Sequence, residues 1–321
     1  MTSYLRERIL VSIAETGNAS RTAEVLGISQ PTVSTTLKKI EQEVGGHVYH
    51  HGERPIVLTT LGEILCRQYA KIVSVAEQTD CYLRSYGKGI PPLLRMGSVH
   101  SFSTDINPYF IPLLLEKTEK IVIRLAPSNE VSKMILENQL DLAIVNEDLR
   151  GTPDLAVTEL LSENFQLCLP ARLAKIKSFR EAGLLEKLSS LPFIEPCDTA
   201  LDYQTVNGII NSLGIHPKKT MAVDCFSTMC QIVNRGEGWS LMTPLAMWIG
   251  RSFIENIVTL PLDTPNCSKH FFLCKRPWVS DSFEKCFLKL LSNALFNEFL
   301  PLVSHMAPNL ARQIHISKFL A

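Results

Sequence analysis

The sequence has no features typical of exported, membrane-spanning or disulfide-bonded chains. No run approaches the roughly 18 consecutive apolar residues that a membrane helix needs. Charges fall within the first eight residues, where a signal peptide would have its apolar region. The nine cysteines are scattered, with no Cys-x-x-Cys pair and no zinc-like double pair. We therefore predict a cytoplasmic protein with reduced thiols, no metal centre and no membrane partner.

Catalytic signatures are also missing. There is no Gly-x-Gly-x-x-Gly, no phosphate-binding loop and no His-Glu-x-x-His. The segment 238–242 (GWSLM) does not have the final glycine of a nucleophile elbow. Cys197 and His100 could meet across a cleft, but nothing in the sequence orients that histidine. We expect a protein that is not an enzyme and that has no cofactor.

An excess of positive charge is absent as well. The chain has 321 residues, with 32 basic and 32 acidic side chains and a hydrophobic fraction of 45%. This is ordinary globular composition, and the length suggests two domains, one of which could be split. Any contact with nucleic acid must come from a local surface, because the overall charge gives no attraction to a polyanion.

Three short helices are predicted before residue 45. The first covers 4–16, with an apolar stripe from Leu5 to Ile13. The second covers 21–26 with Ser20 as its N-cap, and Gly27 ends it. The third covers 30–44 with Ser29 as its N-cap, and its inner face carries Val33, Leu37, Ile40 and Val44. The second and third helices predict a helix-turn-helix, whose second helix offers a polar face to a major groove.

A wing and a long helix follow. Residues 48–58 predict two short strands around a tight loop with Arg54 near its tip. Thr60 and Glu63 match a capping box. The heptad series after them has two polar slots, and it predicts a helix of about 27 residues, roughly 40 Å long, with nothing local to pack against. We interpret it as a dimerisation helix rather than as ordinary core; the series is Leu61, Leu65, Gln68, Ile72, Val75, Thr79, Tyr82 and Tyr86.

The order of these motifs resembles the LysR-type transcriptional regulators. The resemblance begins at 19–34 (ASRTAEVLGISQPTVS), continues at 37–45 (LKKIEQEVG) and 58–63 (LTTLGE), and includes 140–144 (LDLAI) and 236–244 (GEGWSLMTP). It covers about residues 3–297. It implies a winged helix-turn-helix DNA-binding domain at 1–58, a linker helix at 59–88, an effector-binding domain at 92–297 and a C-terminal extension at 298–321.

The resemblance further implies an α/β effector domain with two lobes, as in periplasmic binding proteins. The first lobe is expected at 92–160 with 268–297, and the second at 161–267. It implies double-stranded DNA with a roughly palindromic site as the partner, self-association through the linker helix and then into a tetramer, and RNA polymerase if the protein is an activator. A small-molecule co-inducer is expected between the lobes. The residues expected to contact DNA are Ser20, Arg21, Gln30, Pro31, Thr32, Ser34, Thr35, Lys38 and Arg54.

The sequence departs from the family pattern in the DNA-binding segment. Thr35 stands where the family often has arginine, and Tyr49-His50-His51 stands where its wing often has Phe-x-Arg. Residues 1–58 contain six basic and six acidic side chains. A modest salt dependence is therefore predicted. His47, His50 and His51 could hold a metal ion, but without a nearby cysteine or carboxylate set we favour histidines that face solvent or DNA.

Short apolar runs alternate with helical patterns after residue 92. Strands are predicted at 93–99, 121–125 and 142–145, and again at 193–195, 220–223 and 239–242. Helices are predicted between them, so each lobe has a mostly parallel sheet. Ligands of such sheets lie at the carboxyl ends of the strands. This rule predicts an effector site formed by His100, Ser101, Phe102, Ser103, Ser128, Asn146, Cys197, Thr199, Tyr203, Phe226, Ser227 and Thr243.

The segments around this predicted site contain no lysine or arginine. They contain eight acids, which are Asp105, Glu130, Glu147, Asp148, Glu195, Asp198, Asp202 and Asp224. Dianionic ligands usually meet an arginine, so we predict a neutral, aromatic or cationic effector. Two alternatives stay open: redox sensing through Cys197, and a small-molecule-binding protein or α/β enzyme without specific DNA binding.

Overall fold

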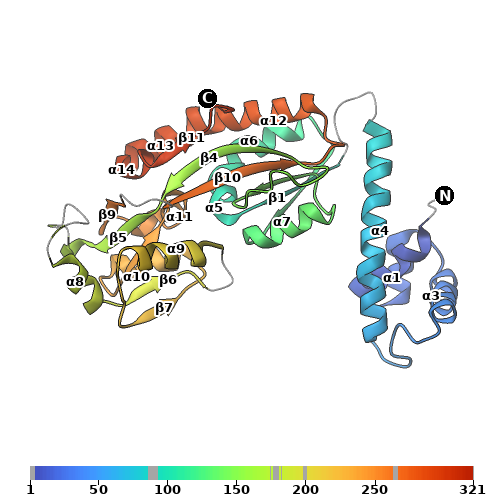
Figure 1. Ribbon diagram of the computed structural model, residues 1–321. Coiled ribbons are helices and arrows are strands. Elements are labelled where there is room, and N and C mark those ends of the chain that lie inside the picture. The colour runs from blue at the N-terminus through green and yellow to red at the C-terminus, as the bar shows by residue number, and fades with distance from the viewer. Residues whose placement is uncertain are drawn as a thin grey trace. The chain divides into compact units, whose positions relative to one another are not determined.

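The computed structural model describes residues 4–85, 93–173, 175, 181, 183–197, 201–262 and 267–320. It divides into two compact units (Figure 1). The first comprises Met1–Tyr86 with Glu137–Gln139, and the second comprises Gly87–Leu136 with Leu140–Ala321.

The described residues of the N-terminal unit form four helices, α1 (Leu5–Thr16), α2 (Ala19–Leu26), α3 (Gln30–Val44) and α4 (Thr60–Ser85). The core between them is apolar and fully buried at its centre; its members are Ile9, Leu10, Ile13, Ala23, Val33, Leu37, Ile40, Val48 and Tyr69. The helical periodicity of α1 and α3 produces this core, because residues three and four apart share one face. Val44 departs from the prediction: it lies on the last turn of α3 and is 37% exposed.

The helix boundaries correct two predicted N-caps. Asn18, and not Ser20, caps α2, since its side chain accepts the N–H groups of Ser20 and Arg21 at 2.9 and 3.1 Å. Thr59, and not Thr60, precedes α4, and its hydroxyl accepts the N–H of Gly62 at 3.1 Å. An N-cap residue lies just outside the helix. Because α2 begins at Ala19 and α4 at Thr60, their caps are the residues before these positions. Ser29 caps α3 as predicted.

The wing is a loop closed by one antiparallel bridge between Tyr49 and Leu58, and not a pair of strands as predicted. Its base packs tightly against the start of α4. A Cβ at Gly62 would lie 1.9 Å from the carbonyl oxygen of Val48. Only glycine allows this close approach, so Gly62 fixes the wing relative to α4.

Helix α4 has two sides of different character. Contrary to the prediction, its first half has a local partner: Leu65, Cys66 and Tyr69 join the core formed by α1. The Tyr4 hydroxyl donates to Asp80 at 3.0 Å and extends this contact along the helix. A second stripe is exposed to solvent in this chain; its members are Leu61, Ile64, Ile72 and Val75, each 39–48% exposed.

The strands of the second unit, within its described segments, form two sheets. The six-stranded sheet has the order β11-β4-β10-β3-β1-β2, and the five-stranded sheet has the order β7-β6-β8-β5-β9. We call each sheet, with the helices that cover it, a lobe. The strands of the first sheet are β1 (Leu93–Ser98), β2 (Lys120–Leu125), β3 (Leu142–Val145), β4 (Ala156–Asn164), β10 (Ser268–Lys275) and β11 (Ile314–Ile316). Those of the second are β5 (Gln166–Pro170), β6 (Phe193–Glu195), β7 (Thr220–Ala222), β8 (Trp239–Met242) and β9 (Ile257–Pro261).

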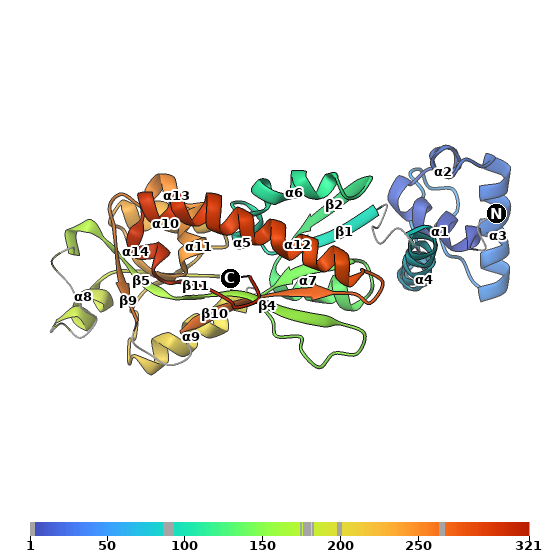
Figure 2. The ribbon, with the colours of Figure 1, turned by 90° about the horizontal axis from the view of Figure 1, so that it is seen from above.

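Helices cover both faces of the first sheet, as the α/β class requires (Figures 1 and 2). One face carries α5 (His100–Ser103), α6 (Asn107–Leu115) and α12 (Asp281–Asn293), and the rings of Phe110 and Phe287 meet edge to face at 5.3 Å. The other carries α7 (Ser128–Leu136), whose Val131 and Ile135 pack under β3. In the second lobe the helices are α8 (Leu184–Ser190), α9 (Leu201–Ser212), α10 (Phe226–Asn234) and α11 (Pro244–Ile249).

The chain crosses between the lobes at β4–β5 and again before β10. Strand β4 stays paired with β10 through Asn164, four residues beyond the boundary predicted at 160. The C-terminal extension belongs to the first lobe, where α13 (Leu300–Met306) and α14 (Pro308–Ala311) lead into β11. Strand β11 pairs with Leu161–Glu163 on the outer edge of β4. The sequence alone assigned no role to this segment.

Among the described residues, one helical run, Asp281–Met306, is long and apolar enough to span a membrane by length and composition. Lys289 and Glu298 interrupt it, so it is apolar on average without being an uninterrupted apolar run. Phe283, Phe287, Leu291, Leu295 and Phe299 of this run are buried in the core of the second unit. The run is therefore accounted for by packing on the first lobe.

Candidate functional site

The outward face of α3 is polar. Its inward residues Val33, Leu37 and Ile40 are buried, so the helical repeat turns the residues between them outward. Gln30 donates to the Ser34 hydroxyl at 2.9 Å. The structure brings the predicted DNA-contacting residues onto the surface of one unit: Ser20, Arg21, Gln30, Pro31, Thr35, Lys38 and Arg54 are exposed, and Thr32 and Ser34 are partly exposed.

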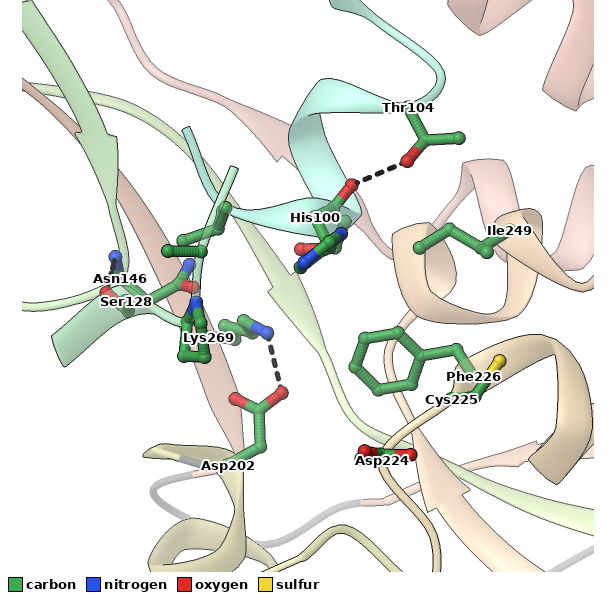
Figure 3. Close-up of a pocket in the computed structure, with 14 residues that line it drawn as sticks. His100, Thr104, Ser128, Asn146, Asp202, Asp224, Cys225, Phe226, Ile249 and Lys269 are labelled. Carbon is green, nitrogen blue, oxygen red and sulfur yellow. Dashed lines mark hydrogen bonds and ion pairs between the residues drawn. The ribbon is translucent and has the colours of Figure 1, made fainter. Parts of the chain in front are cut away.

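The two lobes of the second unit enclose a pocket of about 410 Å³ (Figure 3). Most of its wall comes from strand ends and the helices that follow them. Val99–Ser101 follow β1, Ala126–Ser128 follow β2 and Asn146 follows β3. The second lobe contributes Asp202 at the start of α9, Asp224–Phe226 before and within α10, and Ile249 at the end of α11.

Five of the predicted effector-binding residues line this pocket: His100, Ser101, Ser128, Asn146 and Phe226. Ser128 also accepts the N–H of Asn146 at 2.8 Å, which joins the ends of β2 and β3. The rule that ligands lie at the carboxyl ends of parallel strands (the strand-end rule) therefore located the part of the pocket that the first lobe forms.

The other predicted residues lie elsewhere. Phe102 is fully buried against Phe271, and Ser103 accepts a hydrogen bond from Asn107, because these residues point to the core side of α5. Thr243 is buried at the start of α11. Cys197, Tyr203 and Ser227 are partly exposed and do not line the pocket. Thr199 lies outside the described residues.

The pocket lining includes a lysine that was not predicted from the sequence. Lys269 belongs to β10, which returns from the second lobe, and its Nζ donates to Asp202 Oδ2 at 2.7 Å (Figure 3). The side chain is 7% exposed. The premise that the site has no basic residue was therefore wrong. A lysine two positions before the apolar run 271–274 (FFLC) was the available signal.

A second acid of the predicted set is also neutralised from a distant segment. Asp105 is buried and accepts a hydrogen bond from Arg251 at 2.8 Å. Burial raises the pKa of Asp105, although the guanidinium partly opposes that effect. Asp105 follows β1 and Arg251 follows α11, so this pair, like Lys269–Asp202, joins the two lobes.

The strand neighbour of Lys269 is a buried carboxyl group, that of Glu163. Glu163 of β4 is directly opposite Lys269 in the register of β4 and β10, and it is completely inaccessible to solvent. Its Oε2 accepts the N–H of Leu245 at 2.8 Å. Burial raises the pKa of Glu163 to about 7, even though Lys269 and the hydrogen bonds act in the other direction.

The described cysteines are free thiols. Cys197 is partly exposed, and Cys225 is exposed at the N-cap of α10. Hydrogen bonds from Thr228 and Ser227 lower the pKa of the Cys225 thiol. The buried thiol of Cys230, five residues later, has its pKa raised to about 12 by burial. For Cys197 the structure gives a free, partly exposed thiol, and redox sensing through it stays a prediction from the sequence.

Two family models match this chain. Residues 6–63 match the bacterial regulatory helix-turn-helix protein, lysR family, and residues 88–279 match the LysR substrate binding domain. The chain belongs to the LysR family: it is a DNA-binding transcriptional regulator with an effector-binding domain, and it is not an enzyme.

Relatives and solved structures agree. The Probable RuBisCO transcriptional regulator of Guillardia theta is 26% identical over 216 residues, 65% of this chain and 68% of the relative. The HTH-type transcriptional regulator BbuR of Bordetella bronchiseptica is 23% identical over 233 residues, 72% of this chain and 71% of the relative. A full-length OxyR variant from Pseudomonas aeruginosa has a TM-score of 0.64 at 19% identity, covering 92% of this chain and 95% of that one. Full-length CbnR complexed with its target DNA has a TM-score of 0.62 at 15% identity, covering 91% and 99%. These similarities confirm the predicted fold class. The expectation of a mostly parallel sheet in each lobe was wrong, because the strands at which the chain crosses between the lobes, β4, β5 and β10, pair in antiparallel fashion.

Proposed function

We propose that α3 enters the major groove of a roughly palindromic promoter site. Gln30, Thr32, Ser34 and Thr35 reach base edges, while Lys38 and Arg54 hold the phosphate backbone. The proposal rests on the exposed polar face of α3, which a buried apolar face holds in place. Ser20, Arg21 and Pro31 lie at the starts of α2 and α3, where backbone N–H groups favour phosphate.

Two self-associations accompany DNA binding in this proposal. The exposed stripe of α4 forms the dimer seam, and two dimers form a tetramer. The first lobe offers a surface for the second contact: Tyr109, Leu113 and Leu115 of α6 and Ile123 and Leu125 of the edge strand β2 are all exposed. Apolar patches of this kind mark protein interfaces. As an activator, the assembly would also contact RNA polymerase.

The effector binds in the pocket between the lobes. Small polar groups from β1, β2 and β3 face Phe226 and Ile249 across it, so one end of the ligand forms hydrogen bonds and the other packs on apolar surface. Lys269 is already paired with Asp202, and Asp224 adds a second carboxylate. This balance supports a small molecule that is neutral or cationic overall. Tight binding of a simple dicarboxylate would contradict it.

Effector binding acts by a population shift between lobe arrangements. The Lys269–Asp202 and Asp105–Arg251 pairs join the lobes in the arrangement described here. A ligand that competes for Asp202 favours a different arrangement only to the extent of its differential affinity for the two states. The change would reach the DNA through the spacing of the subunits in the tetramer.

The first test is a mobility-shift assay on the DNA upstream of the protein's own gene, run as a salt series. Saturable binding that survives nonspecific competitor is expected. Absence of binding at low salt, on that DNA and on a pool of genomic fragments, would overturn the DNA-recognition proposal.

Replacing Thr35 with arginine should strengthen DNA binding. An added phosphate contact steepens the dependence of log K on log salt by about 0.9 for each protomer. The measurement is the slope of DNA affinity between low and moderate salt. Gln204→Arg, which adds the same charge to an exposed position of α9, is the matched control. Equal slopes for wild type and Thr35→Arg would place Thr35 away from phosphate.

Replacing Ser101 with tryptophan should remove the effector response and preserve DNA binding. Ser101 is 2% exposed and lines the pocket, so the larger ring occupies the ligand's space. Effector affinity should fall by about tenfold or more, equivalent to about 1.4 kcal/mol or more of binding free energy, because the indole ring and the ligand compete for the same space. Calorimetry with the effector and a mobility shift without it separate the two functions. Unchanged effector affinity would contradict the assignment, and loss of DNA binding as well would indicate a damaged fold.

A further inference from the structure

In the N-terminal unit, three side chains of types that can ligate metals lie close together between α3 and the wing. His47 Nδ1 lies 3.3 Å from Glu41 Oε1, and His51 Nε2 lies 3.0 Å from each Glu41 oxygen. One donor atom from each residue lies within 4.8 Å of the others. Two zinc ligands bound at about 2.0–2.2 Å in a tetrahedral site are separated by about 3.4 Å, so this arrangement needs little adjustment to surround an ion.

The carboxylate of this group is held in place by the fold. Glu41 is in the last turns of α3, its side chain is 10% exposed, and its Oε1 accepts the N–H of Val48 at 3.0 Å. Burial alone would raise the pKa of Glu41, but hydrogen bonds from His51, Val48 and His47 outweigh it and lower that pKa. The carboxylate is therefore present as an anion at neutral pH.

The histidines remain open to solvent. The His47 and His51 side chains are 75% and 48% exposed. The His51 ring is also stacked on Tyr49 with 4.4 Å between centroids, which orients it toward Glu41. An ion arriving from solvent would thus meet one fixed anionic ligand and two accessible imidazoles, with a fourth position left for water.

We propose that Glu41, His47 and His51 form a binding site for a divalent transition metal ion of the Zn²⁺ class. Two imidazoles and one carboxylate suit Zn²⁺ and Co²⁺, whereas Mg²⁺ and Ca²⁺ prefer sites made entirely of oxygen ligands. The sequence alone showed the histidines, but the carboxylate is six and ten residues away and meets them only through the fold.

The site has a consequence for DNA binding. Residues 1–58 carry no net formal charge, so a bound dication would give this unit a positive charge. It would also join the wing, which carries His51 and Arg54, to the end of α3, one turn beyond Lys38. Metal binding should therefore raise the affinity for DNA and steepen the dependence of log K on log salt.

The test measures metal binding directly, on the tag-free full-length chain without DNA. Calorimetry with Zn²⁺, and visible absorption with Co²⁺, should show one ion bound per chain with the spectrum of a tetrahedral site. His47→Gln and His51→Gln should each weaken Zn²⁺ binding by about tenfold or more. Glu41→Gln should do the same while keeping an oxygen to accept the Val48 N–H.

His50→Gln is the matched control, because His50 is an exposed histidine of the same loop outside the cluster. Its Zn²⁺ affinity should equal that of the wild type. Equal weakening in all four variants, or a wild type that binds Zn²⁺ no better than His47→Gln, would overturn the proposal. Strong binding of Mg²⁺ at the same residues would overturn the assigned metal class.

Discussion

Introducing glutamate at Ile72 and Val75 together should weaken binding to a palindromic DNA site by about a hundredfold. Both side chains are nearly half exposed on α4 and take no part in the described core, so the substitutions leave the fold of each chain intact. They place two carboxylates on the proposed dimer seam. A dimer gains about 10² to 10⁴ in affinity by engaging two half-sites, and a monomer loses that gain. Sedimentation and mobility shifts measure the two effects.

The control for this variant is Arg67→Glu, which changes the charge of α4 by the same amount from a different side of the helix. It should remain a dimer and retain DNA affinity. A double variant that stays dimeric, or that becomes monomeric and binds the full site as before, would show that this stripe is not the seam that supports DNA binding.

Replacing Glu163 with glutamine should remove a pH-dependent loss of stability. The folded protein releases the Glu163 proton at about pH 7, whereas an unfolded chain releases it near the ordinary glutamate value of 4.5. The unfolded state therefore binds fewer protons between these values, and the free energy of unfolding falls as pH rises through this window. The shift corresponds to at most about 3 kcal/mol above pH 7.

The measurement is the urea midpoint of wild type and Glu163→Gln at about pH 5, 6, 7 and 8, which spans the window between the two pKa values. The amide keeps an oxygen to accept the Leu245 N–H, so the variant should gain stability relative to wild type as pH rises. Glu186→Gln, at an exposed position of α8, should track the wild type. A constant difference between wild type and Glu163→Gln across this range would show that Glu163 is ionised in the folded state.

Local sequence was sufficient for the strands at the centre of each sheet. Residues 142–145, 193–195 and 239–242 are short apolar runs beside turn residues, and they match β3, β6 and β8 residue for residue. Strands that are buried on both faces are nearly continuous apolar runs, and their short length between turn residues distinguishes them from helices. The N-caps of α2 and α4 were misplaced by one or two residues, because Asn18, Ser20, Thr59 and Thr60 all have capping side chains and tertiary packing selects among them.

The pocket residues that follow parallel strands could be predicted from the sequence. The pocket residue on the strand that returns from the second lobe could not. His100, Ser128, Asn146 and Phe226 follow parallel strands or start the next helix, so the strand-end rule located them. Lys269 lies within an antiparallel strand that enters from the other lobe, and its pairing with Asp202 spans 67 residues. No local pattern reports such a contact. The same is true of β11, a three-residue strand paired with β4 from a distant part of the chain.

Strand β11 also limits how this sheet can polymerise. It covers β4 at Leu161–Glu163, and the Ser317 N–H and hydroxyl then donate to the carbonyl oxygens of Leu160 and Glu159. In the described part of the chain, the first sheet therefore ends in the three-residue strand β11 on one side and in the six-residue strand β2 on the other. A very short edge strand offers few unpaired backbone groups to another chain, whereas a long exposed edge can template the pairing of further chains. The segment that carries β11 thus replaces the edge of the nine-residue strand β4 with a shorter one, which makes edge-to-edge aggregation at this side of the sheet less favourable.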